Sequence, residues 1–248
     1  MTRNNFGDIL YKIVCAGGKM IYITGDTHIP VDISKLNTKN FPSSKDMTKE
    51  DFLIICGDFG GVWDNSKEEK YWLKWLEQKN FTTLFIDGNH ENFDMLNSFD
   101  EEELFGGKVH KVSEGIYHLI RGYVYEIDGW SFFAFGGASS HDIHLRTEGV
   151  NYWKEELPSE EEIKRAYDNL GKSGWNVDYV ITHCAPTSVQ KIISSGYEEN
   201  ILTDEFENIS KRLGFEKWFF GHYHRDIDID GRFIGVFDKI IKIDSKTK

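Results

Sequence analysis

The sequence predicts an α/β fold, in which buried strands alternate with amphipathic helices. Short apolar runs recur along the chain and stop at turn signals, as where Phe52-Leu53-Ile54-Ile55-Cys56 meets Gly57-Asp58. Segments with helical periodicity lie between these runs, for example residues 66–79. With 248 residues, 40% of them hydrophobic and 28% charged, the chain is long enough to bury a large core.

The first half of the chain supplies three of the expected strands. They cover residues 20–24, 52–56 and 81–86, and each is a short run of apolar or β-branched residues. Residues 31–49 are polar, and we expect a loop there with one short helix. Helices are expected at 66–79, where aromatic and apolar residues share one face, and around 93–99.

The middle of the chain changes character to β-rich segments separated by turn signals. Residues 109–135 form a hairpin or meander in this interpretation, with Asp128-Gly129 as one turn. Ser159 begins a capping-box pattern that opens a helix ending near Gly171. Further on we expect strands at 177–182 and 218–220, a helix at 203–213, and closing β-structure at 226–244.

The net charge limits which macromolecules the protein could bind, and the cysteine content indicates the cellular compartment. The formal net charge of −12 argues against binding to long nucleic acids or anionic membranes, which requires a basic surface. The odd set of Cys15, Cys56 and Cys184 does not suggest a disulfide framework and favours a reducing, cytoplasmic location. No stretch approaches the ~20 continuous apolar residues that a membrane span needs.

The domain expected from this pattern covers residues 20–248 as a single unit, since no linker or low-complexity tract interrupts it. Residues 1–19 mix charges and glycines and precede the first expected strand at Met20. We therefore expect them to form a poorly ordered extension.

Residues that commonly bind metals follow five of the expected strands. Open α/β sheets bind ligands at the carboxyl ends of their strands, so these side chains are expected to meet at one rim. Carboxylate, imidazole and amide groups together suit divalent ions such as Mn, Fe, Zn or Ni. Their number is too high for one tetrahedral site and fits two ions that share Asp58 as a bridge. The set is Asp26, His28, Asp58, Asn89, His90, His183, His222 and His224.

The spacing of two pairs suggests how they present their side chains. Asp26 with His28, and His222 with His224, are two residues apart, which would point both members the same way from an extended segment. Three other histidines lack a position after such a strand, and we expect ordinary surface or loop roles for His110, His118 and His144.

Five motifs, in this order, resemble those of the calcineurin-like metallophosphoesterases: Gly25-Asp26-x-His28, Gly57-Asp58, Gly88-Asn89-His90-Glu91, Thr182-His183 and Gly221-His222-x-His224. The resemblance implies a four-layer α/β/β/α sandwich with two mixed β-sheets. It also implies two ligand sets that share Asp58. The first ion would take Asp26, His28, Asp58 and His224; the second would take Asp58, Asn89, His183 and His222.

The resemblance further implies that His90 lies near the leaving group, so the expected catalytic residues are His90 and Asp58. In the protein-phosphatase branch of the family an Asp-Arg-Gly block follows the second motif. Here Phe59-Gly60-Gly61 follows, which argues against a dedicated phosphoprotein phosphatase. Candidates for binding the substituents of the substrate are Arg146, His141 and Arg225.

The expected activity is hydrolysis of a phosphomonoester or phosphodiester. Two divalent ions ~3.5–4 Å apart clamp the attacking and leaving oxygens, and a metal-bound water ionises near pH ~7 to give the attacking hydroxide. His90 would donate a proton to the departing oxygen. The alternatives are a nuclease or nucleotide phosphodiesterase and, on the same fold, a non-catalytic scaffold.

Overall fold

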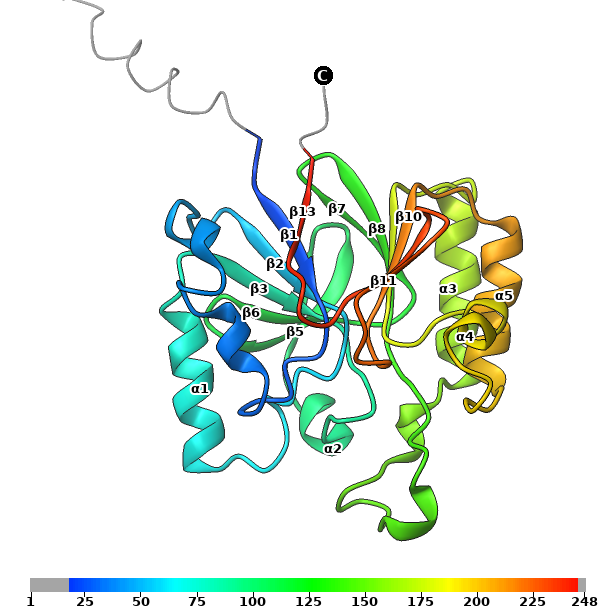
Figure 1. Cartoon of the computed structure of the whole chain (residues 1–248), viewed down its shortest axis with the longest axis horizontal. Coiled ribbons are helices and arrows are strands. Elements are labelled where there is room, and N and C mark those ends of the chain that lie inside the picture. The colour runs from blue at the N-terminus through cyan, green and yellow to red at the C-terminus, as the bar shows by residue number, and fades with distance from the viewer. Residues whose placement is uncertain (1–17, 245–248) are drawn as a thin grey trace, which may run out of the picture.

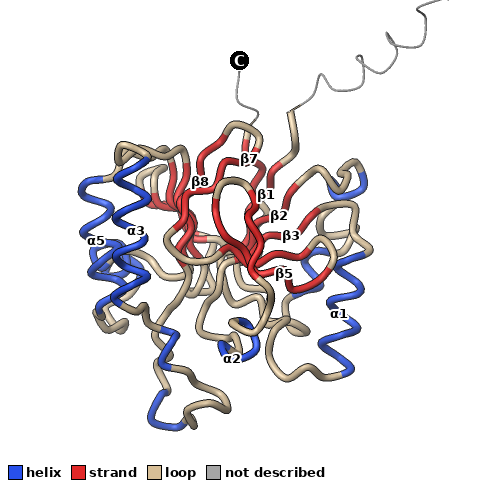
Figure 2. Tube along the Cα trace, turned by 180° about the vertical axis from the view of Figure 1, so that it is seen from behind, coloured by secondary structure: helices blue, strands red, loops and turns tan. Residues whose placement is uncertain are grey.

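The computed structural model describes residues 18–244, and its two β-sheets face one another with helices on both outer faces (Figures 1 and 2). The α/β fold with two mixed sheets flanked by helices is thereby confirmed. Residues 1–17 lie outside the described part of the chain. The expected extension, residues 1–19, falls almost entirely within this range.

The first sheet has seven strands, and its parallel centre is bordered by antiparallel strands on both sides. Strands β1, β2, β3 and β6 run parallel, while β13 pairs antiparallel with β1, and β5 pairs antiparallel with both β6 and β4. In spatial order the sheet contains β13 (Ile241–Ile243), β1 (Ile21–Thr24), β2 (Phe52–Ile55), β3 (Thr82–Phe85), β6 (Ile116–Leu119), β5 (Gly107–Ser113) and β4 (Glu101–Leu104).

The second sheet has six strands and the same mixed character. Strands β8, β9, β10 and β12 run parallel, with β7 and β11 antiparallel at the two edges. In spatial order it contains β11 (Ile227–Ile229), β12 (Phe233–Gly235), β10 (Lys217–Phe220), β9 (Tyr179–Thr182), β8 (Trp130–Phe135) and β7 (Tyr123–Ile127). The β7–β8 hairpin turns at Asp128-Gly129, as the sequence predicts, and both residues have positive φ.

The helices form the outer layers of the sandwich. Over the first sheet lie α1 (Lys67–Glu77) and α2 (Phe93–Leu96); over the second lie α3 (Glu160–Lys172), α4 (Thr187–Ile193) and α5 (Ile201–Arg212). Ser159 makes the expected capping box at the start of α3. No helix among residues 18–244 is long and apolar enough to cross a membrane.

The alternation of side chains along each strand generates three apolar layers. On β1 and β2, Ile23 and Ile54 pack between the two sheets, while Leu53 packs on the helix side of the first sheet. On β10, Phe219 enters the layer between the sheets and Trp218 packs against the outer helices. Because both faces of the central strands are covered, these strands are continuously apolar in sequence.

Several elements differ from the sequence prediction. Strand β4 and helix α4 were not expected, and residues 31–49 contain two 3₁₀ helices, Ile33–Leu36 and Pro42–Lys45, rather than one short helix. β4 reads Glu-Glu-Glu-Leu, which lacks an apolar face because it is an edge strand with mostly exposed side chains. Helix α4 has seven residues, too few to show a clear helical period.

The prediction that His110 and His118 are surface or loop residues was wrong, whereas His144 is exposed as expected. His110 and His118 lie buried on β5 and β6, with their Nδ1 atoms 3.1 Å apart. The Nε2 atom of His118 is 3.0 Å from Oδ1 of Asp87, and Arg121 donates to Oδ2 of Asp87 from Nε at 2.9 Å and from Nη2 at 2.5 Å. The carboxylate of Asp87 thus provides hydrogen-bond partners for the buried imidazole of His118 and the buried guanidinium of Arg121.

Candidate metal centre

Four of the predicted ligands lie together at the carboxyl ends of strands from both sheets. Asp26 and His28 follow β1, Asp58 follows β2, and His224 follows β10. Each offers one ligand atom, and these four atoms lie within 4.8 Å of one another. The sheets therefore converge on one cluster, although the sequence pattern had suggested the rim of a single sheet.

The backbone turns sharply at this cluster. The prediction that Asp26 with His28, and His222 with His224, lie on extended segments and point the same way was therefore wrong. Positive φ angles occur at His28 (34°), Asp58 (46°), His222 (66°) and His224 (48°). Because of these turns His222 and His224 diverge: the ring of His222 lies 5.1 Å from that of His183, and the ring of His224 lies 4.9 Å from that of His28. Left-handed conformations of non-glycine residues are unfavourable and concentrate at functional sites.

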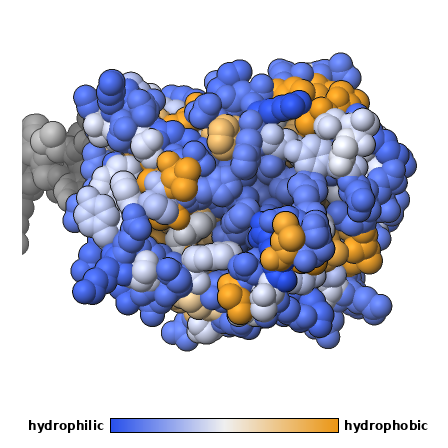
Figure 3. Space-filling model, turned by 60° about the horizontal axis from the view of Figure 1, so that its bottom comes forward, coloured by the Kyte–Doolittle hydropathy of each residue, from blue (hydrophilic) through white to orange (hydrophobic). Residues whose placement is uncertain are grey.

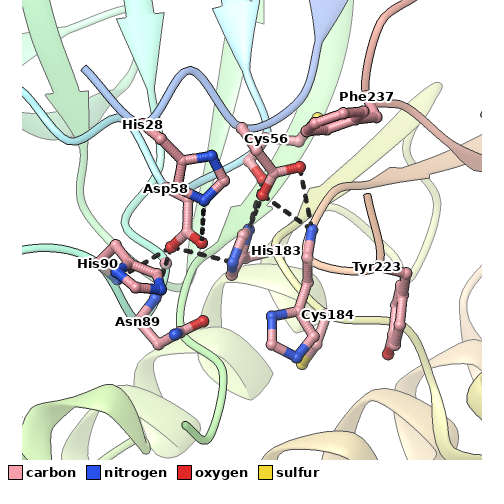
Figure 4. A network of polar contacts seen from close by, with 12 residues as sticks. His28, Cys56, Asp58, Asn89, His90, His183, Cys184, Tyr223 and Phe237 are labelled. Carbon is pink, nitrogen blue, oxygen red and sulfur yellow. Dashed lines mark hydrogen bonds and ion pairs between the residues drawn. The ribbon is translucent and has the colours of Figure 1, made fainter. Parts of the chain in front are cut away.

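Asp58 lies between His28 and His183, one histidine from each group (Figure 4). Its Oδ1 accepts hydrogen bonds from the backbone N–H groups of Asn89 and His90, both at 2.9 Å. His28 Nε2 is 3.1 Å from Oδ2, and His183 Nε2 is 3.2 Å from Oδ1. One carboxylate therefore faces an imidazole from each group.

Two buried polar atoms lie beside Asp58: within residues 18–244 the amide oxygen of Asn89 has no hydrogen-bond partner, and Nε2 of His183 faces Oδ1 of Asp58 at 3.2 Å. The Asn89 amide nitrogen donates to Ser140 Oγ at 3.2 Å, and Nδ1 of His183 lies 2.7 Å from the carbonyl oxygen of Cys56. The first bond leaves the lone pairs of Asn89 Oδ1 free, and the second orients the His183 ring so that Nε2, once deprotonated, could bind a cation. Because an unpaired buried polar atom is costly, Asn89 Oδ1 fits a role as a cation ligand, and His183 Nε2 fits the same role by its position beside the Asp58 carboxylate.

The charges of the cluster are balanced by protons on its histidines. Burial raises the pKa of Asp26 to about 7. Burial would also raise the pKa of Asp58, but the charge of His183 outweighs it and holds this pKa well below its usual range. Burial alone would lower the pKa values of His28 and His183, yet Asp58 raises them to about 9 and about 10. Divalent cations would displace these protons on binding.

The turn after β3 approaches Asp58 so closely that it requires glycine. A Cβ atom at Gly88 would lie 2.1 Å from Asp58 Oδ1 and 2.7 Å from His183 Nε2. It would occupy the space in which the carboxylate and imidazole meet.

We therefore expect Gly88→Ala to weaken metal binding by about tenfold or more, because ligand orientation is worth that much in comparable sites. Isothermal titration with Mn²⁺ measures the change. Gly171→Ala in α3 is the matched control, since a Cβ there meets nothing within 4 Å. Unchanged Mn²⁺ affinity in Gly88→Ala would show that this close approach does not matter for the ligands.

A cavity of about 320 Å³ lies over the cluster, and it brings together several sequence-predicted site residues. His90, His141 and Arg146 line it together with Asp58 and Asn89. Arg146 is held in place by Asp142 at 2.6 Å and by the carbonyl oxygen of Asn151 at 3.1 Å. Arg225 does not line this cavity but a neighbouring one.

Two residues that position the ligands were not among the predicted site residues. Glu91 is fully buried and accepts the backbone N–H groups of Phe59 at 2.7 Å and Gly88 at 2.5 Å, which ties the loops after β2 and β3 together. Lys35 donates to the carbonyl oxygens of Asp26 at 2.7 Å and Phe237 at 2.5 Å. Glu91 is the last residue of the Gly88-Asn89-His90-Glu91 motif, which was an available signal, whereas Lys35 lies in a polar stretch that offers no such signal.

Comparison with known proteins identifies one matching family. The model of the calcineurin-like phosphoesterase family matches residues 19–226, and a search of curated proteins found no match. The matched range contains all of the predicted metal ligands, from Asp26 to His224. The chain therefore belongs to the calcineurin-like phosphoesterase family.

Proposed function

We propose that the protein is a phosphoester hydrolase that uses two divalent ions, with Mn, Fe, Zn or Ni as the candidate metals. Asp26, His28, Asp58 and His224 hold one ion in this proposal; Asp58, Asn89, His183 and His222 hold the other. The observation that carries it is the position of Asp58 between His28 Nε2 and His183 Nε2, beside the unpaired Asn89 Oδ1. When bound, such ions lower the pKa of water and neutralise charge on phosphoryl oxygens.

The chain's own residues would bind and orient the ester. Arg146 presents a guanidinium to the cavity, and such a group pairs well with phosphate oxygens. His141 and Arg225 would contact the substituent of the phosphoryl group, since both line the larger neighbouring cavity. A cytoplasmic location remains part of the proposal and is supported by Cys56 and Cys184, which are buried and free.

His90 is the candidate acid for the departing oxygen. Its ring is half-buried, lines the cavity over the cluster and lies 5.4 Å from the ring of His28. Burial lowers the pKa of His90 below its ordinary value. Proton donation therefore depends on the negative phosphoryl group, which would favour the charged imidazolium beside it.

We expect His90→Asn to lower kcat/KM much more for an alkyl phosphate than for p-nitrophenyl phosphate. An alkoxide needs a proton as it departs, and general-acid help is typically worth ~10²–10⁴-fold, whereas p-nitrophenolate leaves readily as an anion. The two losses are measured at saturating Mn²⁺. Equal losses on both esters would assign His90 to support of the Asn89 turn instead.

The activity itself is tested by loading the purified protein with Mn²⁺, counting the bound ions by elemental analysis, and measuring turnover. We expect two ions per chain and hydrolysis of p-nitrophenyl phosphate or bis-p-nitrophenyl phosphate, the ratio of which separates monoesterase from diesterase activity. One ion or none would contradict the two-ion site. Bound ions without turnover of either ester would favour a non-catalytic scaffold.

A further inference from the structure

A second cavity, of about 780 Å³, adjoins the one over the metal ligands. His141, Tyr197 and His222 line both cavities, so the two share part of their walls. The larger one, which we call the side cavity, lies between the start of a projecting lobe (residues 139–157) and the connection from α4 to α5 at residues 194–200. The face in Figure 3 is hollowed near its middle, and mainly hydrophilic residues surround the hollow.

The size of the side cavity indicates an organic group attached to the phosphate. Cavities of about 300–1,000 Å³ hold ligands of drug size. The phosphoryl group itself would occupy the smaller cavity, over Asp58 and Asn89. The side cavity then has the volume and position to hold the leaving group.

One wall of the side cavity is aromatic. The rings of His141 and Tyr197 have centroids 4.8 Å apart and planes inclined by 51°. The ring of Tyr197 packs against the ring of Tyr223 in an edge-to-face contact, with centroids 4.8 Å apart and planes at 90°. Such a braced ring offers a flat surface on which a planar base can stack.

Other residues that line the side cavity carry hydrogen-bonding groups with unused capacity. Asn200 caps α5 with its amide oxygen, which accepts from the N–H groups of Leu202 and Thr203, so its amide nitrogen remains to donate. The carboxylate of Glu198 has no ion pair among residues 18–244, and within that range Arg225 bonds with its guanidinium only to the carbonyl oxygen of Ile193, at 3.3 Å. An alkyl chain would leave these groups without partners, whereas sugar hydroxyls both donate and accept.

We propose that the side cavity binds a nucleoside, so that the substrate is a nucleoside monophosphate. The base stacks on Tyr197 and His141, and the ribose hydroxyls bond to Asn200 and Glu198. The proposal rests on the hydrolase activity proposed above. In the reaction the oxygen of water bonds to phosphorus, the bond from phosphorus to the ribose oxygen breaks, and a proton goes to that oxygen. The products are a nucleoside and inorganic phosphate.

The test compares adenosine 5′-monophosphate with ribose 5-phosphate, which lacks the base. With Mn²⁺-loaded protein we expect kcat/KM to be about tenfold or more higher for the nucleotide, the size of one base–aromatic stack. Tyr197→Leu should bring the ratio of the two values close to one, and Tyr197→Phe should retain most of it. Tyr71→Leu is the matched control, because Tyr71 lies exposed on α1.

A second measurement does not depend on catalysis. Saturation-transfer difference NMR of adenosine with metal-free protein should show transfer to the base protons, and Tyr197→Leu should reduce it. Adenosine binding without hydrolysis of any ester would leave the site intact and overturn the proposed activity. A wild-type ratio near one, or a ratio that Tyr197→Leu leaves unchanged, would overturn the nucleoside site.

Discussion

Asp58→Asn is expected to lower kcat/KM by about 10³-fold or more, the largest loss for any single ligand. The carboxylate faces His28 on one side and His183 on the other, and it accepts the N–H groups of Asn89 and His90. A neutral amide would remove the negative charge that both proposed ions share, and this raises the repulsion between them. Steady-state kinetics on p-nitrophenyl phosphate, with bound Mn²⁺ counted in parallel, measure the effect.

Other variants test whether the large loss in kcat/KM is particular to Asp58 as the residue shared by both proposed ions. Asp32→Asn removes the carboxylate that lies 2.8 Å from Nδ1 of His28, and a loss of roughly 10–100-fold is expected for such an orienting partner. Asp168→Asn, on the exposed face of α3, should leave kcat/KM unchanged. Should His28→Ala or His183→Ala prove worse than Asp58→Asn, Asp58 would not be the bridge.

Asp87→Asn is expected to be the most destabilising of the conservative changes, by about 3–5 kcal/mol. The substitution leaves the buried Arg121 without its charged partner and weakens the contact to His118. For a chain of this size the loss corresponds to a fall in Tm of roughly 6–20 °C. Differential scanning calorimetry measures it, with Asp168→Asn as control because its ion pair with Lys164 is exposed to solvent.

The pH dependence of this difference follows from the direction of the pKa shift. Burial would raise the pKa of Asp87, but the charge of Arg121 and the bond to His118 hold it well below its usual range. A depressed pKa stabilises the fold above the unfolded value of about 3.9, and this contribution is lost as the pH falls through the folded value. The Tm difference between wild type and Asp87→Asn should therefore be full at pH 6–7 and shrink below about pH 4. A constant difference across this range would contradict the ionised pair.

The sequence by itself determined the α/β class, most of the strands and the residue types at their ends. These features are local: short apolar runs mark the buried strands, and Gly-Asp, Gly-Asn-His and Gly-His-x-His each lie within one turn. The expected strand ends before Asp26, Asp58 and Asn89 all exist in the structure. The candidate ligands Asp26, His28, Asp58 and His224, which the structure groups together, could therefore be named without knowing how the strands pair.

The tertiary structure alone decided the features that depend on distant parts of the chain. It placed β9 and β10 in a second sheet, so that His183 and His224 reach the Asp58 cluster from a different sheet than Asp26, His28 and Asp58. It also buried His118 against Asp87 and formed the side cavity between residues 139–144 and 194–200. The cause is physical: strand pairing, burial of polar groups and cavity shape arise from contacts between residues far apart in sequence, whereas periodicity reports only the neighbours of a residue along its own strand or helix.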